Sequence, residues 1–248
     1  MSNKPETLRL AMWSGPRNIS TAMMRAWGNR PDTFVCDEPL YAHYLAVTGL
    51  PHPGRDEVIA HHETDWRKVV AWLTGPVPEG KAIFFQKHMA HHLLPGMDDA
   101  WLDQLTHAFL IRDPREMLLS LVKVTPEVTL ADTGLVQQVE LLRRQEQRFG
   151  RIPPILDARD VLEHPREMLS ALCDRLGVAF AEEMLAWPAG PRPTDGIWAK
   201  HWYAAVEKST GFEAYRPRRE VIPVRYRTLL DEANSIYQLL HERRIRPS

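Results

Sequence analysis

Short apolar runs alternate with longer segments of helical period along most of the chain, and this alternation constrains the fold more than any other feature of the sequence. Each run ends in a small or charged residue, and several are almost continuously apolar. Such runs are typical of strands that helices cover on both faces. The pattern therefore predicts an α/β fold in which a parallel sheet lies between helices. The expected strands are residues 8–13, 33–36, 82–86, 108–111 and 154–157.

The segments between the apolar runs predict helices. Pro114 and Pro165 stand where a first helical turn would begin, a position at which the missing amide hydrogen of proline costs nothing. Gly177 is a plausible helix stop. The Pro- and Gly-containing stretch 187–196 predicts a long loop rather than a domain boundary, and we expect residues 1–248 to form one domain. The expected helices are residues 20–27, 39–47, 65–73, 114–122, 134–149, 165–176 and 224–241.

The charge balance argues against a polyanionic partner. The chain has 31 Lys and Arg against 32 Asp and Glu, which gives a formal net charge of -1. A balance of this kind provides no global attraction to nucleic acid or to an anionic membrane surface. We therefore expect no nucleic-acid or membrane partner, and any bound anion must be held by a local group of residues.

The two cysteines and the lack of long apolar stretches predict a soluble, cytoplasmic protein. Cys36 and Cys173 lie far apart in sequence and form no CxxC or Cys/His ladder, so neither a structural zinc site nor a dithiol redox site is expected. Two reduced, buried thiols fit the cytoplasm best. The apolar run near the N-terminus is too short for a signal peptide, and no stretch approaches the roughly 20 apolar residues of a membrane helix.

The first expected strand leads into a loop suited to an anion. The segment LRLAMW-SGPRNIST-AMMRAW places Gly15, Arg17 and the hydroxyl pair Ser20 and Thr21 at the start of a helix. A helix start offers unpaired N–H donors, and a guanidinium adds a forked, charge-assisted contact. The alternative is an ordinary N-cap at Ser20 after a simple turn. The loop lacks the lysine of the GxxxxGK[ST] phosphate loop, which argues against an ordinary kinase.

A second strand-to-helix turn repeats this chemistry. In HAFLIRDPREMLLSLVK, Arg112 falls at the carboxyl end of the strand and Ser120 lies two turns into the helix. Ligands of open α/β sheets bind at the carboxyl ends of the strands, so Arg112 should point toward the same edge as the loop of Arg17. The alternative is a surface arginine paired with Asp113.

Together these segments resemble the P-loop-related sulfotransferases, which transfer a sulfuryl group from 3′-phosphoadenylyl sulfate (PAPS) to a hydroxyl or amine. The resemblance covers most of residues 8–180, including the later strand and helix in PILDARDVLEHPREMLSALCDRLGV. It implies a three-layer, P-loop-like parallel sheet flanked by helices. It departs from the family at Ile19, where a glycine is usual, and at Arg17, where lysine is more common. By resemblance, the 5′-phosphosulfate is held by Arg17, Ser20, Thr21 and the backbone around Asn18, and the 3′-phosphate by Arg112 and Ser120.

The resemblance also suggests candidates for the chemistry. Glu38 follows the second expected strand, where carbohydrate-type members of the family have a catalytic glutamate; the alternative is that it only charges the first turn of the next helix. Lys87 could neutralise the transferring sulfuryl group, and His88 is a second candidate base. Both should emerge at the crevice after the strand that ends at residue 86.

Two further groups of residues have competing interpretations. Two histidine-rich segments suggest a metal site at first sight. Because they lack the spacing of metal ligands, we interpret these residues as solvated polar side chains and predict no metal. The residues are His61, His62, Glu63, His91 and His92.

In DGIWAKHWYAAVEKSTGFEAY, aromatic rings could stack on adenine while Lys200 meets its phosphate. The alternative is an amphipathic helix that packs Trp198, Trp202 and Val206 into the core.

The leading hypothesis is a PAPS-dependent sulfotransferase that acts on a small-molecule or glycan acceptor. The alternatives are a nucleotide or small-molecule kinase with an unusual phosphate loop, and a non-catalytic nucleotide-binding protein of the same fold, for which Ile19 is the best support. Residues 41–64 and 124–133 are expected to shape the acceptor site. Their composition fits sugars, lipids, phenols or amines alike, and the sequence indicates no particular oligomeric state.

Overall fold

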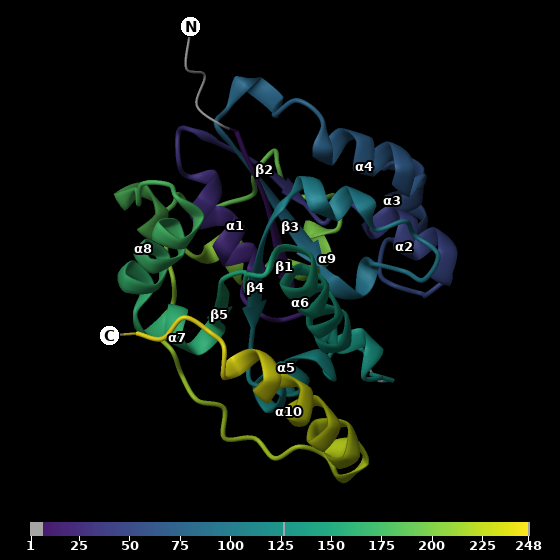
Figure 1. The fold of residues 1–248 in the computed structure, drawn as a ribbon. Coiled ribbons are helices and arrows are strands. Elements are labelled where there is room, and N and C mark those ends of the chain that lie inside the picture. The colour runs from purple at the N-terminus through teal and green to yellow at the C-terminus, as the bar shows by residue number, and fades with distance from the viewer. Residues whose placement is uncertain (1–6, 126, 248) are drawn as a thin grey trace, which may run out of the picture.

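The computed structural model, which describes residues 7–125 and 127–247, contains a five-stranded parallel sheet with helices on both sides (Figure 1). The strand order is β2-β3-β1-β4-β5, and every neighbouring pair is parallel. The α/β fold expected from the apolar runs is therefore confirmed. The strands are β1 (Leu8–Ser14), β2 (Thr33–Asp37), β3 (Ile83–Met89), β4 (Thr106–Ile111) and β5 (Ile155–Asp157).

One strand differs in length from the expectation in a way that affects the site. Strand β3 does not end at residue 86 but continues to Met89, because it pairs with β1 along the whole length of that strand. Lys87 and His88 lie opposite Met12 and Trp13 in this register. The two residues are therefore part of a buried strand and not of a loop that follows it.

The long helices lie close to the residue ranges expected from the sequence. Three short helices, α3, α7 and α9, were not expected as separate elements, since they contain too few residues for an apolar period to stand out. The expected stop at Gly177 is confirmed by its left-handed backbone, with φ of 71°. The helices are α1 (Ser20–Gly28), α2 (Tyr41–Thr48), α3 (Arg55–His61), α4 (Trp66–Thr74), α5 (Pro114–Leu121), α6 (Leu135–Phe149), α7 (Ala158–Glu163), α8 (Pro165–Leu176), α9 (Ala199–Trp202) and α10 (Arg227–His241).

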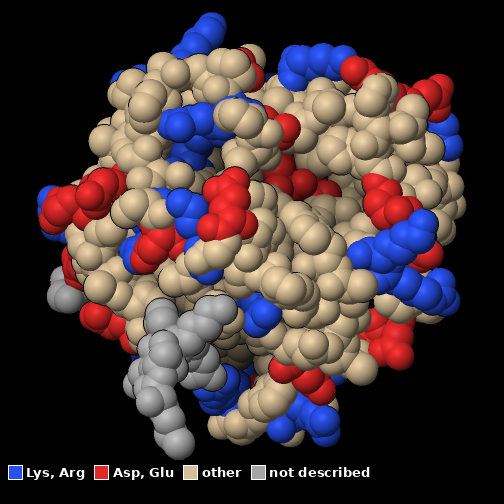
Figure 2. Space-filling view, turned by 90° about the horizontal axis from the view of Figure 1, so that it is seen from above, with Lys and Arg blue, Asp and Glu red and all other residues tan. Residues whose placement is uncertain are grey.

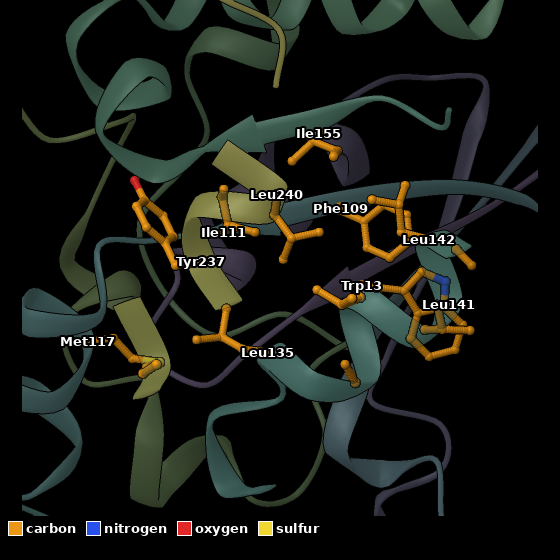
Figure 3. Close-up of a cluster of buried hydrophobic side chains, with 14 of the residues drawn as sticks. Trp13, Phe109, Ile111, Met117, Leu135, Leu141, Leu142, Ile155, Tyr237 and Leu240 are labelled. Carbon is orange, nitrogen blue, oxygen red and sulfur yellow. The ribbon is translucent and has the colours of Figure 1, made fainter. Parts of the chain in front are cut away.

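The side chains of β1 alternate between two apolar cores, one on each face of the sheet. Leu10 and Met12 pack with α1 and α8, whereas Ala11 and Trp13 pack with α4, α6 and α10. All four are fully buried. Figure 3 shows the second core, in which side chains of α6 and α10 point toward those of the strands. The labelled residues are Trp13, Phe109, Ile111, Met117, Leu135, Leu141, Leu142, Ile155, Tyr237 and Leu240.

The two edges of the sheet differ in character. The edge at the top of Figure 1 holds the amino ends of the strands, and seen from above it carries acidic and basic side chains interspersed (Figure 2). At the opposite edge, the loops that follow the strands meet an irregular segment, residues 209–223, that runs across the bottom of the molecule to α10. We call this segment the strap. The functional residues predicted from the sequence belong mainly to this carboxyl edge.

Two observations bear on the environment of the protein. Both cysteines, Cys36 and Cys173, are buried free thiols, as expected. Among the described residues, no helix combines the length and the apolar character that are needed to cross a bilayer.

A buried ion pair ties α1 to the expected long loop at residues 187–196, which has no regular secondary structure. Arg25 donates from Nη1 and Nη2 to the two carboxylate oxygens of Asp195 at 2.5 and 2.7 Å. The side chains are only 3% and 4% exposed. Because both side chains are shielded from water, the charge of Arg25 and the charge of Asp195 compensate each other.

We expect Asp195→Ala to lower the free energy of unfolding by about 3–5 kcal/mol, since the substitution leaves a buried guanidinium without its counter-charge. Urea unfolding followed by circular dichroism measures the change. Asp174→Ala, at an exposed position on α8, is the matched control and should change the stability little. Equal stability of the two variants would contradict the role given to this ion pair.

Candidate functional site

The loop between β1 and α1 has an unusual backbone. Arg17 and Ile19 both adopt left-handed conformations, with φ of 62° and 57°. This region is costly for a β-branched side chain, so a glycine at position 19 would be favoured on backbone grounds alone. Ile19 occupies the N-cap position of α1 and no side chain caps the helix. Ser20 is therefore the first helical residue, and the ordinary N-cap considered for it is wrong.

Close packing fixes the position of this loop. The main chain at Gly15 passes so near Thr133 that a Cβ atom would lie 2.2 Å from the Thr133 carbonyl oxygen, which requires a glycine. Asn18, only 1% exposed, donates from Nδ2 to the carbonyl of Leu110 at 3.3 Å. The loop is thus held between the end of β4 and the turn that precedes α6.

The two turns predicted from the sequence are in direct contact. Arg112 donates from Nη1 to the main-chain oxygen of Arg17 at 2.8 Å, and Arg17 donates from Nε to Ser120 Oγ at 2.9 Å. Arg112 also forms an ion pair with Glu116 at 3.1 Å. The alternative pairing of Arg112 with Asp113 is wrong, because Asp113 instead caps α5 by accepting from the backbone N–H groups of Arg115 and Glu116.

The positive groups at these turns repel one another. Burial lowers the pKa of Arg17 from its usual value, and the charges of Arg112 and Arg218 lower it further. A guanidinium remains charged under such conditions, so the electrostatic cost is relieved most directly by an anion between the arginines. This end of the site therefore favours a negatively charged ligand.

A cavity of about 460 Å³ opens at the carboxyl edge of the sheet, between the β1–α1 loop, α2, α5 and the strap. Most of the residues predicted for the site line this one cavity. They are Arg17, Asn18, Ser20, Thr21, Glu38, Lys87, Arg112 and Ser120. His88 and Lys200 are not among the lining residues.

Lys87 forms the centre of a buried polar network next to the cavity. Its ammonium group donates to Asp37 Oδ1 at 2.7 Å, to Glu38 Oε1 at 2.5 Å and to the Tyr203 hydroxyl at 2.7 Å. The Tyr203 hydroxyl in turn donates to Asp37 Oδ2 at 2.7 Å, and the N–H of Gly196 reaches the same oxygen at 3.0 Å. Burial alone would lower the pKa of Lys87, but the two carboxylates outweigh it and raise this pKa well above its usual value. Lys87 is thus a fixed positive charge.

Glu38 is the carboxylate of this network that faces the cavity. Its backbone has a φ of 40°, a strained value for a residue other than glycine. Burial raises the pKa of Glu38, Lys87 lowers it, and Asp37 raises it again, so that the net direction is upward. A carboxylate with a raised pKa is a stronger base than a free one.

The structure places His88 away from the cavity. Its ring stacks on Trp13 with centroids 4.3 Å apart, and Nε2 lies 3.2 Å from Gln86 Oε1. Burial, with help from the charges of His107 and Lys87, lowers the pKa of His88 to about 3. His88 therefore belongs to the apolar core beneath the site, contrary to the expected position at the crevice.

Lys200 also lies elsewhere. It forms an ion pair with Glu57 on α3, at the surface. The cations that the late part of the chain adds to the cavity are instead Arg216 and Arg218 of the strap. The basic run RPRRE at residues 216–220 is the sequence feature that contains these two arginines. It shows no helix or strand period and does not follow a strand, so its position at the cavity could not be predicted. The packing alternative for this region is supported, since Trp198 is buried and Trp202 and Val206 pack against the same cluster.

The histidines considered as solvated residues are in part buried. His92 is 2% exposed and lies between Tyr41 and Tyr44, whose ring centroids are 5.0 and 4.6 Å from its own. His91 contacts Tyr44 as well. The interpretation of these two residues as solvated side chains is therefore wrong, because aromatic rings of α2 cover them. The described residues contain no group of three or more His, Cys, Asp or Glu side chains arranged to hold a metal ion.

Comparison with known proteins identifies the family. The profile of the family described as "Sulfotransferase domain" matches residues 8–244. The chain belongs to the sulfotransferase domain family. The same fold is found in a sulfotransferase from Alicyclobacillus acidocaldarius, with a TM-score of 0.54, 14% identity and 97% of each chain covered. It is also found in the sulfotransferase domain from the curacin biosynthetic pathway, with a TM-score of 0.51, 15% identity, 98% of this chain and 100% of that chain covered.

A curated relative at higher sequence identity has a name that refers to an aminotransferase and not to a sulfotransferase. This sulfotransferase domain is 36% identical over 228 residues to "Branched-chain-amino-acid aminotransferase-like protein 2" of Arabidopsis thaliana. The match covers 92% of this chain but 40% of the relative. The chain thus spans less than half the length of that protein.

We expect Tyr203→Phe to lower the free energy of unfolding by about 1–3 kcal/mol, because it leaves a hydrogen-bond donor of Lys87 and an acceptor of Asp37 unpaired in a buried place. Urea unfolding measures this loss. Tyr44→Phe is the matched control: Tyr44 is similarly buried, and within the described part of the chain its hydroxyl has no hydrogen-bond partner. Loss of equal size in both variants would contradict the importance of the network.

Proposed function

We propose that this sulfotransferase domain transfers a sulfuryl group from PAPS to a hydroxyl, or an amine, of a small-molecule or glycan acceptor. The observation that carries the proposal is the contact between the two turns: Arg112 bonds to the backbone of Arg17, and Arg17 bonds to Ser120, within one cavity. Membership of the family supports the reaction class. The donor, the acceptor and the residue roles are proposals.

The chemistry of the lining residues fits an anionic donor. Arg17, Arg112 and Arg218 bring three positive charges to one end of the cavity, and the start of α1 adds backbone N–H groups that no side chain caps. In the proposal, Arg17, Ser20, Thr21 and the backbone at Asn18 hold the 5′-phosphosulfate. Arg112 and Ser120 hold the 3′-phosphate, and Arg216 and Arg218 of the strap add charge where Lys200 was expected to do so.

The proposed reaction needs a cation beside the transferring group and a base beside the acceptor. Glu38 accepts the proton of the acceptor hydroxyl as the new oxygen–sulfur bond forms. The bond between sulfur and the phosphate oxygen of PAPS breaks, and adenosine 3′,5′-bisphosphate leaves with that electron pair. Lys87, which borders the cavity next to Glu38, stabilises the negative charge that moves onto the leaving phosphate.

The alternatives lose support. A kinase has no specific observation in its favour, since the family is that of a sulfotransferase domain. Ile19 is the best support for a non-catalytic protein, yet the loop around Ile19 keeps Arg17 in contact with Ser120 and along the cavity. The isoleucine imposes a backbone cost but does not displace these residues.

We expect adenosine 3′,5′-bisphosphate to bind, and Arg112→Ala to weaken its binding by roughly 10- to 100-fold, because a charge-assisted hydrogen bond contributes about 1.5–3 kcal/mol. Isothermal titration calorimetry measures both. Arg148→Ala, at an exposed position on α6, is the control and should leave the affinity unchanged. The absence of binding to the unmodified protein at millimolar bisphosphate would overturn the proposed donor.

We expect Glu38→Gln to lower kcat by about 10²- to 10⁴-fold while the bisphosphate still binds, because the variant lacks the proton acceptor. Release of bisphosphate from PAPS in the presence of a panel of alcohols and phenols gives the rate. The rate of the unmodified protein should rise with pH through a value above 4.5, since the raised pKa of Glu38 means that the carboxylate ionises later than a free one. The same pH dependence in the glutamine variant would exclude Glu38 as the base.

A further inference from the structure

The half of the cavity that lies away from the arginines has a lining of its own. Rings from α2 and its neighbours border it: Tyr41, Tyr44, His52 and Trp202, together with the histidine pair that follows β3. These rings form one contiguous group, in which Tyr41 contacts His52 and His52 contacts Trp202. We call this half the aromatic end of the cavity. Under the proposed function, it is where the acceptor binds.

Two carboxylates border the aromatic end. Glu38 acts electrostatically on Tyr41, and Asp132 acts on Tyr44 and on His52. The two acids therefore act on different members of the ring group, and both line the cavity. By contrast, Arg17 has Arg112 and Arg218 as its electrostatic neighbours. The cavity is thus divided into a cationic end and an end where carboxylates prevail.

The histidines of the aromatic end add no positive charge. Burial lowers the pKa of His52, although Asp132 opposes the effect. Burial likewise lowers the pKa of His91 to about 4 and that of His92 well below its usual value. At neutral pH these rings are uncharged. The nearest cation of the network, Lys87, is engaged by two carboxylates.

Two polar groups at the aromatic end, Asp132 and His92, lack partners that a bound ligand would supply. Asp132 uses Oδ2 to accept from the N–H and hydroxyl of Thr129, both at 2.8 Å, and no Lys or Arg forms an ion pair with it within the described residues. His92 is 98% buried, lines the cavity and has no hydrogen-bond partner for Nδ1. A cationic group would satisfy the charge of Asp132, and one with N–H donors would also satisfy the lone pair of a neutral imidazole.

We propose that the acceptor is a small hydroxyl compound that carries an ammonium group, held with its ammonium near Asp132 and its hydroxyl near Glu38. Aromatic rings and a carboxylate together are favourable surroundings for an organic cation. A neutral sugar or phenol would leave Asp132 without a counter-charge in a partly buried place. An anionic acceptor would meet two carboxylates. This inference rests on the proposed function and specifies its acceptor.

The test compares acceptors that differ only in charge. The matched pairs are 3-aminopropan-1-ol with butan-1-ol, and choline with 3,3-dimethylbutan-1-ol; in each pair an ammonium group replaces a carbon group of similar shape. Sulfuryl transfer from saturating PAPS to each compound is measured as kcat/KM. We expect the cationic member of each pair to be preferred by at least about tenfold. Equal rates, or a preference for the neutral members, would overturn the inference.

A variant tests the assignment to Asp132. Asp132→Asn should reduce the preference for the cationic acceptor about tenfold, through a lower kcat/KM for the cationic member and a higher kcat/KM for the neutral member, which no longer leaves a carboxylate without a counter-charge. Asp231→Asn, at an exposed position on α10 outside the cavity, is the control and should change neither value. An unchanged preference in the Asp132 variant would show that another group recognises the charge.

Binding measurements separate failure of the inference from failure of the proposed function. The bisphosphate is titrated first, and each alcohol is then titrated into the bisphosphate complex by calorimetry. Binding of the bisphosphate without preferential binding of 3-aminopropan-1-ol over butan-1-ol overturns the acceptor class but leaves the donor proposal standing. Binding of the amino alcohol to protein that does not bind the bisphosphate overturns the donor proposal and retains the cation site.

Discussion

The site depends on the parallel pairing of β1 with both β3 and β4. Because these strands run in one direction and in register, the residues that follow or end them reach the same edge of the sheet. The pairing of Met12 with Lys87 places a buried ammonium below the loop of Arg17, and the end of β4 brings Arg112 to that loop from the other side. The register of the three central strands thus specifies the positions of Arg17 and Arg112, whereas Arg218 reaches the cationic end from the irregular strap.

The sequence was sufficient to predict the strands, the long helices and the residues at the strand ends. It was not sufficient to predict contacts that depend on the path of an irregular segment. The strands could be read because burial on both faces makes them continuously apolar, and Arg112 with Ser120 follows from one strand and one helix. Glu116 as the partner of Arg112 was missed, because Asp113 is adjacent in sequence but is used to cap α5. Arg218 was missed because the strap has no period, and the burial of His92 was missed because its covering rings come from α2.

Three residues with strained backbones, Arg17, Ile19 and Glu38, lie along the same cavity. Each occupies a region that favours glycine, and each such conformation costs about 1–3 kcal/mol unless the surroundings enforce it. The enforcing contacts are visible for two of them: Ser120 and Arg112 hold Arg17, and Lys87 holds Glu38. Among the described residues, a fourth non-glycine residue with positive φ, Glu79, lies away from the cavity. Most of the backbone strain is therefore found where side chains must be aimed at a ligand.

Burial and the position of Asp37 together explain how a base can be kept beside a cation. A lysine alone would lower the pKa of an adjacent glutamate and make it a poor proton acceptor. Here burial raises the pKa of Glu38, and Asp37, which contacts Lys87 at 2.7 Å, adds to the same upward direction by repelling Glu38. Tyr203 and the N–H of Gly196 donate hydrogen bonds to the second carboxylate oxygen of Asp37. Lys87 thus retains its charge for the donor, and Glu38 retains its basicity for the acceptor, because burial and a second, buried carboxylate offset the effect of the lysine on Glu38.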